Sequence, residues 1–386
     1  MTLENKLSTR LTSLDVFRGL TVASMILVNN PGSWDHVLSQ FEHSAWNGCT
    51  FTDLVFPFFL WISGLSITIS FANRSTQEPN HVHSVRRIFL RFLILFFLGL
   101  FINGFPFGLL PGSPNFSLAT IRIPGELQRI AVCYIIVSLI TIYAKLAWRL
   151  FVIILLLAGI WILIKTISVP GYGSGVLGAE GSLHWYIDSI LLHNHTWKYA
   201  PVPGFDPEGI LSTISSITTT LFGALTGQLI LSKNTPKKKM LWLLIFGGSN
   251  ILLGLYINNW LPINKQLWTP SFAIFTAGIA EIVYALCYWL VDIKKYQKIF
   301  RPLQIYGLNS LVSFVVSIII FKASIFIFVI SSSGAVSTIK SYCYTRLFLP
   351  VIGNEMYASL AHAITFELFM YIIAYILYRS KIIIKA

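Results

Sequence analysis

The residues best suited to chemistry form a polar run that leads directly into an apolar segment. The stretch FEHSAWNGCTFTDLVFPFFLW, residues 41–61, carries His43, Trp46 and Asn47 ahead of Asp53. Histidine has an unperturbed pKa of about 6.5, which suits proton transfer near neutral pH. An imidazole close to a carboxylate therefore predicts a general base, and the alternative is a solvated or capping histidine.

The beginning of the apolar segment has the pattern of a helix N-terminus. Thr50-x-x-Asp53 ahead of an apolar run is typical of a capping box, in which Asp53 accepts hydrogen bonds from amides of the first turn. Pro57 has no N–H, so the carbonyl of Asp53 loses its helical partner. We expect a kinked first turn with an available carboxylate, and a purely structural capping role is the alternative.

The composition predicts a membrane protein. The 386 residues are 55% hydrophobic and only 11% charged, with a mean hydropathy of +0.71, whereas soluble domains are about 25% charged. A spanning helix needs about 20 mostly apolar residues. We predict an all-α polytopic membrane protein with about ten transmembrane helices, and the ninth is long enough to be broken or steeply tilted. The expected spans are residues 14–30, 51–73, 87–108, 126–144, 147–167, 209–232, 240–260, 269–291, 303–331 and 356–378.

The net charge of +13 follows from the membrane topology. Twenty of the 28 lysines and arginines fall on the two termini and on alternate connections, whereas the other five connections share five. This asymmetry is the positive-inside pattern, so it predicts cytoplasmic termini, with a short cytoplasmic segment 1–13 and outer loops at about 31–50 and 168–208. We expect one integral domain, residues 1–386, that contacts membrane lipid and binds no nucleic acid.

Polar residues within the apolar spans cost free energy when they are buried in the membrane, and they are often functional. Asn29 lies fourteen residues after Asp15, about 21 Å along a helix in a hydrocarbon core of about 30 Å. This depth predicts a polar pocket that opens outward, and the alternative places Asn29 and Asn30 among the headgroups.

Further polar residues lie at the outer ends of other spans. Arg129 is expected to be the counter-ion of Asp53 or Glu126, or to extend to the headgroups. Glu208, in FDPEG, is favoured by the helix dipole in a first turn. The sequence 193–195, His-Asn-His, lacks a third ligand at a typical spacing, and the four cysteines form no CxxC pair, so we expect no metal.

Several motifs together resemble one family. LDVFRGLTVASMILVNNPG, HSAWNGCTFTDLVFPFFLWISGLSI, GELQRIAVCY, FDPEGILSTISSITTTLFGALTG and INKQLWTPSFAIFTAG resemble the heparan-alpha-glucosaminide N-acetyltransferase family. The resemblance runs from about residue 11 to the C-terminus, and the His-x-x-Trp-Asn-Gly-x-x-x-x-Asp run is its most specific part. Glu126 stands where we would expect an apolar residue.

The resemblance implies transfer of acetyl from cytoplasmic acetyl-CoA to the amine of a glucosamine on the opposite side of the membrane. It places the active-site histidine at His43 and a catalytic asparagine at Asn29. Around these, the expected supporting residues are Asp53, Asn47, Trp46, Arg129 and Glu208. Basic residues of the cytoplasmic face are expected to contact the CoA phosphates, namely Arg18, Arg86 and Arg87. A bacterial inner-membrane location and a homodimer are further expectations.

Two other functions remain open at this point. We expect no counterpart of the lumenal N-terminal region of the animal enzyme, and therefore a free or short amino sugar as acceptor. An acyltransferase that acts on a cell-envelope glycan or lipid-linked sugar is one alternative. An amino-sugar transporter is another, for which Glu281 and Glu367 are the main coupling carboxylates that the spans offer.

Overall fold

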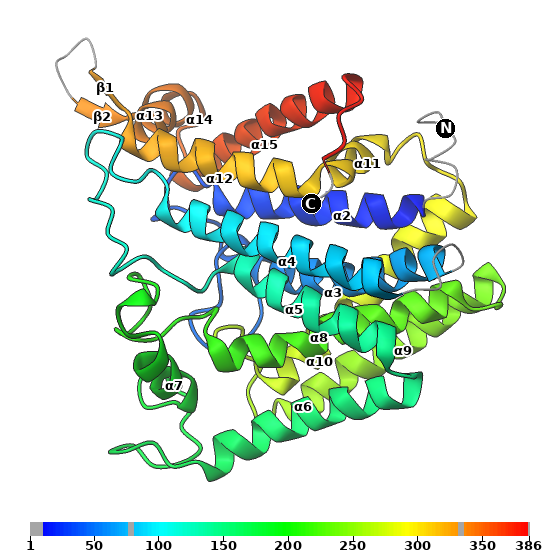
Figure 1. The fold of residues 1–386 in the computed structure, drawn as a ribbon. Helices are drawn as coiled ribbons and strands as arrows, with labels where there is room; N and C mark the ends of the chain where they lie inside the picture. The colour runs from blue at the N-terminus through cyan, green and yellow to red at the C-terminus, as the bar shows by residue number, and fades with distance from the viewer. Residues whose placement is uncertain (1–10, 76–80, 331–335, 385–386) are drawn as a thin grey trace. The chain divides into compact units, whose positions relative to one another are not determined.

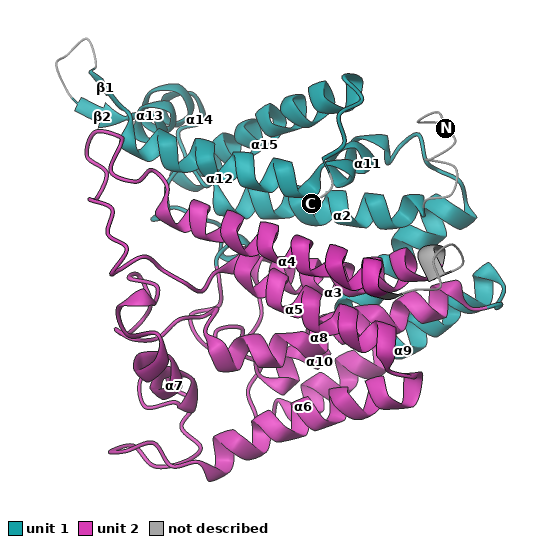
Figure 2. Cartoon of the chain, viewed as in Figure 1, with its two compact units in different colours: residues 1–42, 233–247, 279–385 teal, residues 43–232, 248–278, 386 magenta. Residues whose placement is uncertain are grey.

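A computed structural model describes residues 11–75, 81–330 and 336–384, and these residues are almost entirely helical (Figure 1). The chain divides into two compact units, which Figure 2 shows in different colours. Unit 1 comprises residues 1–42, 233–247 and 279–385, and unit 2 comprises residues 43–232, 248–278 and 386. The predicted all-α class is confirmed, because the only strands among the described residues are those of the short hairpin β1 (Phe328–Ile330) and β2 (Val336–Thr338).

Unit 2 is a bundle in which α3 packs against α8 and α5 contacts both helices. Its apolar core includes Phe56, Leu221 and Trp268. Two further helices, α9 and α10, contribute residues to both units. The helices of this part of the chain are α3 (Phe51–Ser75), α4 (His81–Gly104), α5 (Glu126–Tyr143), α6 (Leu146–Thr166), α7 (Leu183–Leu191), α8 (Ile210–Leu231), α9 (Pro236–Ile257) and α10 (Pro270–Tyr288).

Two glycines allow α3 and α8 to approach closely. A Cβ atom at Gly64 would lie 1.8 Å from the Thr220 carbonyl oxygen, and one at Gly223 would lie 1.9 Å from the Trp61 carbonyl oxygen. Small residues at such crossings let helix backbones touch within a membrane, where packing replaces the hydrophobic effect. The pair therefore fixes the helix that carries Asp53 against α8.

Unit 1 is built around α2 (Thr12–Asn29), which packs on α11 (Arg301–Leu308). Asn309 separates α11 from α12 (Ser310–Phe326), and the two helices are bent by 80°. The Asn309 side chain binds the C-terminal segment. Its amide N–H donates to the Ile382 carbonyl at 2.9 Å, and its amide oxygen accepts from the Ile384 N–H at 3.0 Å. The expected break in the ninth span is confirmed. The remaining helices are α13 (Ile339–Tyr342), α14 (Leu349–Ile352) and α15 (Glu355–Arg379), with a π-helical turn at Cys343–Phe348.

Seven helices of the described part are long and apolar enough to cross a membrane, and the bent pair α11–α12 would make an eighth. Two other predicted spans, 14–30 and 87–108, coincide with α2 and α4, which are not among the seven. The fold is therefore that of a polytopic membrane protein, and the count of ten spans stays a prediction. The seven are α3, α5, α6, α8, α9, α10 with the turn that follows it, and α15.

The close approach of α3 and α8 predicts unequal effects of the same substitution at two helical glycines. Gly223→Ala forces a methyl group against the Trp61 carbonyl and should destabilise the protein by about 1–3 kcal/mol. The methyl group added by Gly159→Ala in α6 would contact no atom within 4 Å outside its own stretch of helix. This substitution should stabilise the protein by up to about 1 kcal/mol. Thermal unfolding of the two purified variants in detergent tests this, and equal midpoints would contradict the packing.

Candidate active site

The carboxylate of Asp53 organises the loop that precedes α3. One oxygen, Oδ2, accepts from the backbone N–H groups of Ser44 and Thr50, both at 3.0 Å, and from the Thr50 hydroxyl at 3.1 Å. The contact with the Thr50 N–H is the arm of a capping box that reaches back from the third helical position. Asp53 thus has a capping role, but the amides from which it accepts belong to Ser44 and Thr50, ahead of the helix, and not to its first turn as predicted. Because the side chain is only 1% exposed, these donors replace the water that the carboxylate loses.

The second oxygen of Asp53 holds His43. His43 Nδ1 lies 2.7 Å from Oδ1 of Asp53, and Lys265 Nζ lies 3.6 Å from the same oxygen and 3.2 Å from Nδ1. An ionised carboxylate can only accept, so Nδ1 carries the proton and donates to it. In the neutral form of this half-exposed imidazole the lone pair is on Nε2, and this atom has no partner among the described residues. A neutral imidazole in this tautomer can accept a proton from a bound molecule.

The loop itself is tied to distant segments of unit 2. The Asn264 amide donates to the Trp46 carbonyl at 2.9 Å and to the Asn47 side-chain oxygen at 3.1 Å. The Trp46 indole N–H donates to the Leu177 carbonyl at 2.8 Å, and the Gly48 N–H to the Ile263 carbonyl at 2.7 Å. Trp46 and Asn47 therefore hold the loop in place beside His43.

Lys265 is the residue of this site that the sequence reasoning missed. It is 222 positions from His43, and we counted it only as one of the five outer-face cations. The signal that points to it is the polar pair Asn264-Lys265 in the short connection between α9 and α10, within a motif of the family pattern.

Cys49 is adjacent to the site but is not suited to carry an acyl group. Burial and the nearby charge of Asp53 raise its pKa to about 12, against the opposing effect of Lys265. Since the thiolate is the nucleophilic form, a thiol that stays protonated leaves His43 as the candidate nucleophile or base.

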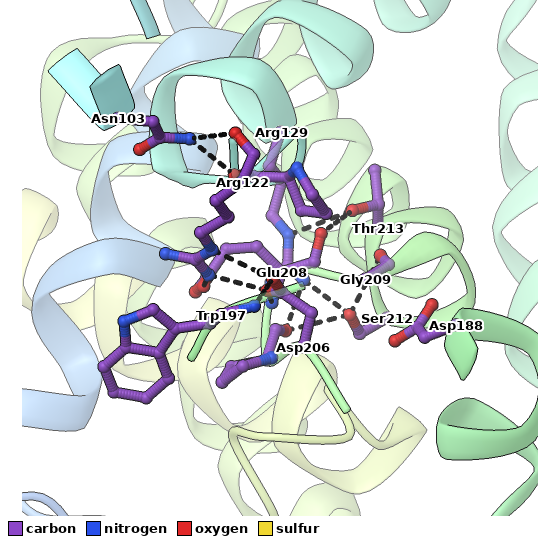
Figure 3. Close-up of polar contacts among 12 residues, drawn as sticks. Asn103, Arg122, Arg129, Asp188, Trp197, Asp206, Glu208, Gly209, Ser212 and Thr213 are labelled. Atoms are coloured by element: carbon purple, nitrogen blue, oxygen red, sulfur yellow. Dashed lines mark hydrogen bonds and ion pairs between the residues drawn. The ribbon is translucent and has the colours of Figure 1, made fainter. Parts of the chain in front are cut away.

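A second polar network lies at the start of α8 (Figure 3). Arg122 donates to both oxygens of Asp206, at 2.9 and 2.6 Å, and to Glu208 at 2.5 Å. Asp206 also accepts from the backbone N–H groups of Trp197 and Glu208. Burial alone would raise the pKa of Glu208, but the charges of Arg122, Arg129 and Lys265 and the hydrogen bond from Arg122 together lower it. Asp206 and Glu208 thus share one arginine as their ion-pair partner.

Arg129 joins this network through neutral groups. Its guanidinium donates to the Pro207 carbonyl at 2.6 Å and to the hydroxyls of Ser212, at 2.5 Å, and Thr213, at 3.2 Å, and it stacks on the ring of Trp268 at 4.9 Å. It forms no ion pair within the described ranges of the chain. The expected pairing with Asp53 or Glu126 is therefore wrong, because the first turn of α8 supplies the acceptors instead.

The other predicted site residues are separate from these two networks. Asn29 is the last residue of α2, in unit 1, and its half-buried amide has no hydrogen-bond partner in the part of the chain that the structure describes. Arg18 pairs with Asp15 at 3.2 Å. Arg86 and Arg87 are exposed on α4, where the Arg87 Nε donates to the His83 carbonyl. Their roles stay predictions, and the described residues contain no group of three or more His, Cys, Asp or Glu placed to hold a metal ion.

The short helix α7 supports both networks. Its Asp188 accepts from the Ile210 N–H at 2.9 Å and so caps α8, and burial raises the pKa of this carboxyl to about 7. His184 is 2% exposed and forms a hydrogen bond with the backbone of Leu267, two residues after Lys265. Burial lowers the pKa of His184 to about 3, with the charge of Arg129 acting in the same direction and the bond to Leu267 opposing it.

The helical bundle and its histidine–carboxylate site define a polytopic membrane protein with the elements of an acid–base catalyst. Residues 10–183 match the family model of the heparan-alpha-glucosaminide N-acetyltransferase catalytic region. The chain belongs to this family.

Two curated relatives carry the same name. The heparan-alpha-glucosaminide N-acetyltransferase of Homo sapiens is 30% identical over 340 residues, which cover 74% of this chain and 49% of that protein. The enzyme of Mus musculus is 29% identical over 340 residues, which cover 74% of this chain and 50% of that protein. The chain thus spans about half the length of the curated relatives it matches.

The buried neutral His184 predicts a loss of stability in acid. Its pKa is about 3 in the folded protein and 6.5 in the unfolded chain, so the unfolded chain binds more protons between these values and stability falls as pH falls through 6.5. From pH 7 to pH 5 the loss is about 2 kcal/mol. The thermal unfolding midpoint of His184→Gln should therefore fall less over this range than that of wild type. The exposed His193→Asn is the control, and identical pH dependence in all three proteins would contradict the assignment.

Proposed function

We propose that the protein is a transmembrane acetyltransferase that moves acetyl from acetyl-CoA to the amine of a glucosamine-type sugar. The observation that carries this proposal is the arrangement of His43, whose Nδ1 faces the buried Asp53 while Nε2 contacts no polar group of the residues that the structure describes. Family membership supports acyl transfer as the reaction, and it favours an enzyme over a transporter.

The reaction requires a base for the amine and a hydrogen-bond donor that stabilises the negative charge on the thioester oxygen. The amine nitrogen forms a bond to the acetyl carbon and the carbon–sulfur bond of the thioester breaks. The sulfur leaves as a thiolate and becomes the CoA thiol when it takes the proton that His43 removed from the nitrogen. The nitrogen must lose its proton, and His43 Nε2 accepts it. Asp53 stabilises the resulting imidazolium through Nδ1. We assign to Asn29, on its match to the family motif and its unpaired amide, the donation of a hydrogen bond to the thioester oxyanion.

His43 offers two chemical routes. In the first it is the base for direct transfer within a complex of both substrates. In the second, Nε2 attacks the thioester, CoA leaves, and the acetyl-imidazole then passes its acetyl group to the amine. Incubation with radiolabelled acetyl-CoA in the absence of acceptor separates the routes, since only the second leaves a label on the protein.

The distribution of lysine and arginine supports a vectorial reaction. We assign both termini to the cytoplasm, the donor to the cytoplasmic face, and the acceptor and His43 to the outer face of a bacterial inner membrane. Arg18, Arg86 and Arg87 are the cytoplasmic cations that we assign to the CoA phosphates. We also propose that the enzyme forms a homodimer.

Removal of His43 should abolish acetyl transfer. A general base contributes about 10²–10⁴-fold, so His43→Asn should lower kcat by at least this factor, and Asp53→Asn should lower it by about 10² because the tautomer is no longer fixed. The controls are the same substitutions at exposed positions, His193→Asn and Asp35→Asn. Release of CoA with glucosamine in proteoliposomes measures the effect. Full activity of His43→Asn would overturn the assignment, and activity only with a glycan or lipid-linked sugar would change the acceptor.

Loss of the charge of Lys265 should affect turnover more than donor binding. Lys265 Nζ lies 3.6 Å from Asp53 and 3.2 Å from His43, so Lys265→Met leaves the carboxylate without its ammonium partner. We expect kcat to fall about tenfold, equivalent to roughly 1.4 kcal/mol, with the KM for acetyl-CoA unchanged. Lys198→Met, at an exposed lysine, should leave both constants unchanged. A selective rise in the KM for acetyl-CoA would instead assign Lys265 to the donor.

A further inference from the structure

The side-chain amide of Asn264 is fixed in one orientation by two backbone groups. Its Nδ2 atom donates to the Trp46 carbonyl at 2.9 Å, and its Oδ1 atom accepts from the Leu267 N–H at 2.8 Å. A carbonyl can only accept and a backbone N–H can only donate, so the nitrogen and the oxygen of this amide cannot be exchanged. Asn264 is 1% exposed, and its second amide hydrogen is directed at the side chain of Asn47.

This last bond determines the orientation of the Asn47 amide. Asn264 Nδ2 donates to Asn47 Oδ1 at 3.1 Å, so the NH2 group of Asn47 is turned away from Asn264. The Asn47 side chain is exposed, and its Nδ2 atom has no acceptor among the residues that the structure describes. The fold therefore presents two oriented N–H donors to a bound molecule.

Holding the loop in place does not require the Asn47 side chain. Backbone groups on both sides of Asn47 already bind the connection between α9 and α10, since the Trp46 carbonyl accepts from Asn264 and the Gly48 N–H donates to the Ile263 carbonyl at 2.7 Å. Fixing an exposed side chain costs conformational entropy. The effect that the additional bond adds is the orientation of the amide.

Asn47 lies on the same loop as the imidazole that is proposed to accept the proton. Consecutive residues of one connection hold the two side chains, because Lys265 Nζ lies 3.2 Å from His43 Nδ1 and Asn264 binds Asn47. The two groups are complementary, since His43 Nε2 accepts a proton and Asn47 Nδ2 donates a hydrogen bond. A molecule that carries an amine beside an oxygen atom matches both.

We infer that Asn47 binds a hydroxyl oxygen of the acceptor sugar next to the amine. This inference rests on the proposed function and adds to it a contact that selects the acceptor. In glucosamine, the carbon that carries the amine lies between C1 and C3, and each of these carries an oxygen. When the amine reaches His43 Nε2, one of these oxygens accepts from Asn47 Nδ2. Asn264 does not touch the sugar and is a positioning residue.

Deoxy sugars test this contact without depending on catalysis. Calorimetry on the full-length protein in nanodiscs compares glucosamine with its 1-deoxy and 3-deoxy analogues. Wild type should bind one of the two analogues about fivefold more weakly than glucosamine, equivalent to roughly 1 kcal/mol, the size of a neutral hydrogen bond. Asn47→Ala should bind glucosamine and that analogue equally. Asn194→Ala, at an exposed asparagine after α7, should keep the wild-type preference.

Kinetics separate a sugar contact from a purely structural role. In an active enzyme, Asn47→Ala should raise the KM for glucosamine about fivefold. The KM for acetyl-CoA and the pH dependence of kcat should not change, because the pair of His43 and Asp53 is untouched. Asn47→Leu keeps the approximate shape of the side chain without its polar atoms and should give the same result, so it replaces Asn47→Ala if that variant does not fold. Unfolding midpoints close to wild type show that a variant is folded.

The outcomes separate the two proposals. If wild type binds all three sugars equally, or if the Asn47 variants keep the preference for glucosamine, Asn47 does not bind the sugar hydroxyl. A rise in the KM for acetyl-CoA alone would assign Asn47 to the donor and overturn the inference. If the preference exists and depends on Asn47 but wild type releases no CoA from acetyl-CoA, the sugar contact stands and the acetyltransferase proposal fails.

Discussion

The buried carboxylate of Asp53 is the constraint on which the rest of the site depends. Removing a carboxylate from water costs several kcal/mol unless hydrogen bonds and an opposite charge compensate it. Here the compensation comes from Ser44 and Thr50 in the loop before α3, from His43 and from Lys265 between α9 and α10. One group thereby shapes the loop, joins distant parts of unit 2 and orients His43.

This arrangement explains why a helix start is a suitable place for a base. The capping box fixes Asp53 by purely local geometry, and His43 then takes the one carboxylate oxygen that the capping interactions leave available. The close crossing of Gly64 and Gly223 holds α3 against α8, which places the loop near the polar network around Arg122. Catalytic geometry is therefore supported by packing that a membrane helix needs in any case.

Local patterns predicted those parts of the molecule that local physics determines. Hydropathy predicted the helices, and Thr50-x-x-Asp53 predicted the capping box. The length of the ninth span predicted a break or a steep tilt, and the structure places the break at Asn309. Contacts between distant segments were not predictable in this way. Lys265 lies beside His43 through the fold of unit 2, and Arg129 binds the first turn of α8 because carbonyl and hydroxyl acceptors converge there. Neither contact leaves a periodic signal in the sequence.

The ion-paired carboxylates of unit 2 have two different environments. Asp53 accepts hydrogen bonds from the loop before α3 and contacts His43 and Lys265, whereas Asp206 and Glu208 are the partners of Arg122. The first arrangement orients the imidazole of His43. The second joins the segment before α5 to the segment before α8.

The central claim is that His43 donates through Nδ1 to Asp53 and presents an unprotonated Nε2, although Lys265 Nζ lies 3.2 Å from the same Nδ1. Nitrogen NMR of histidine-labelled protein, with the His43 signals assigned by their loss in a His43 variant, measures this tautomer directly. The account predicts a protonated Nδ1 and an unprotonated Nε2 at neutral pH. A protonated Nε2, with Nδ1 accepting from Lys265, would contradict it.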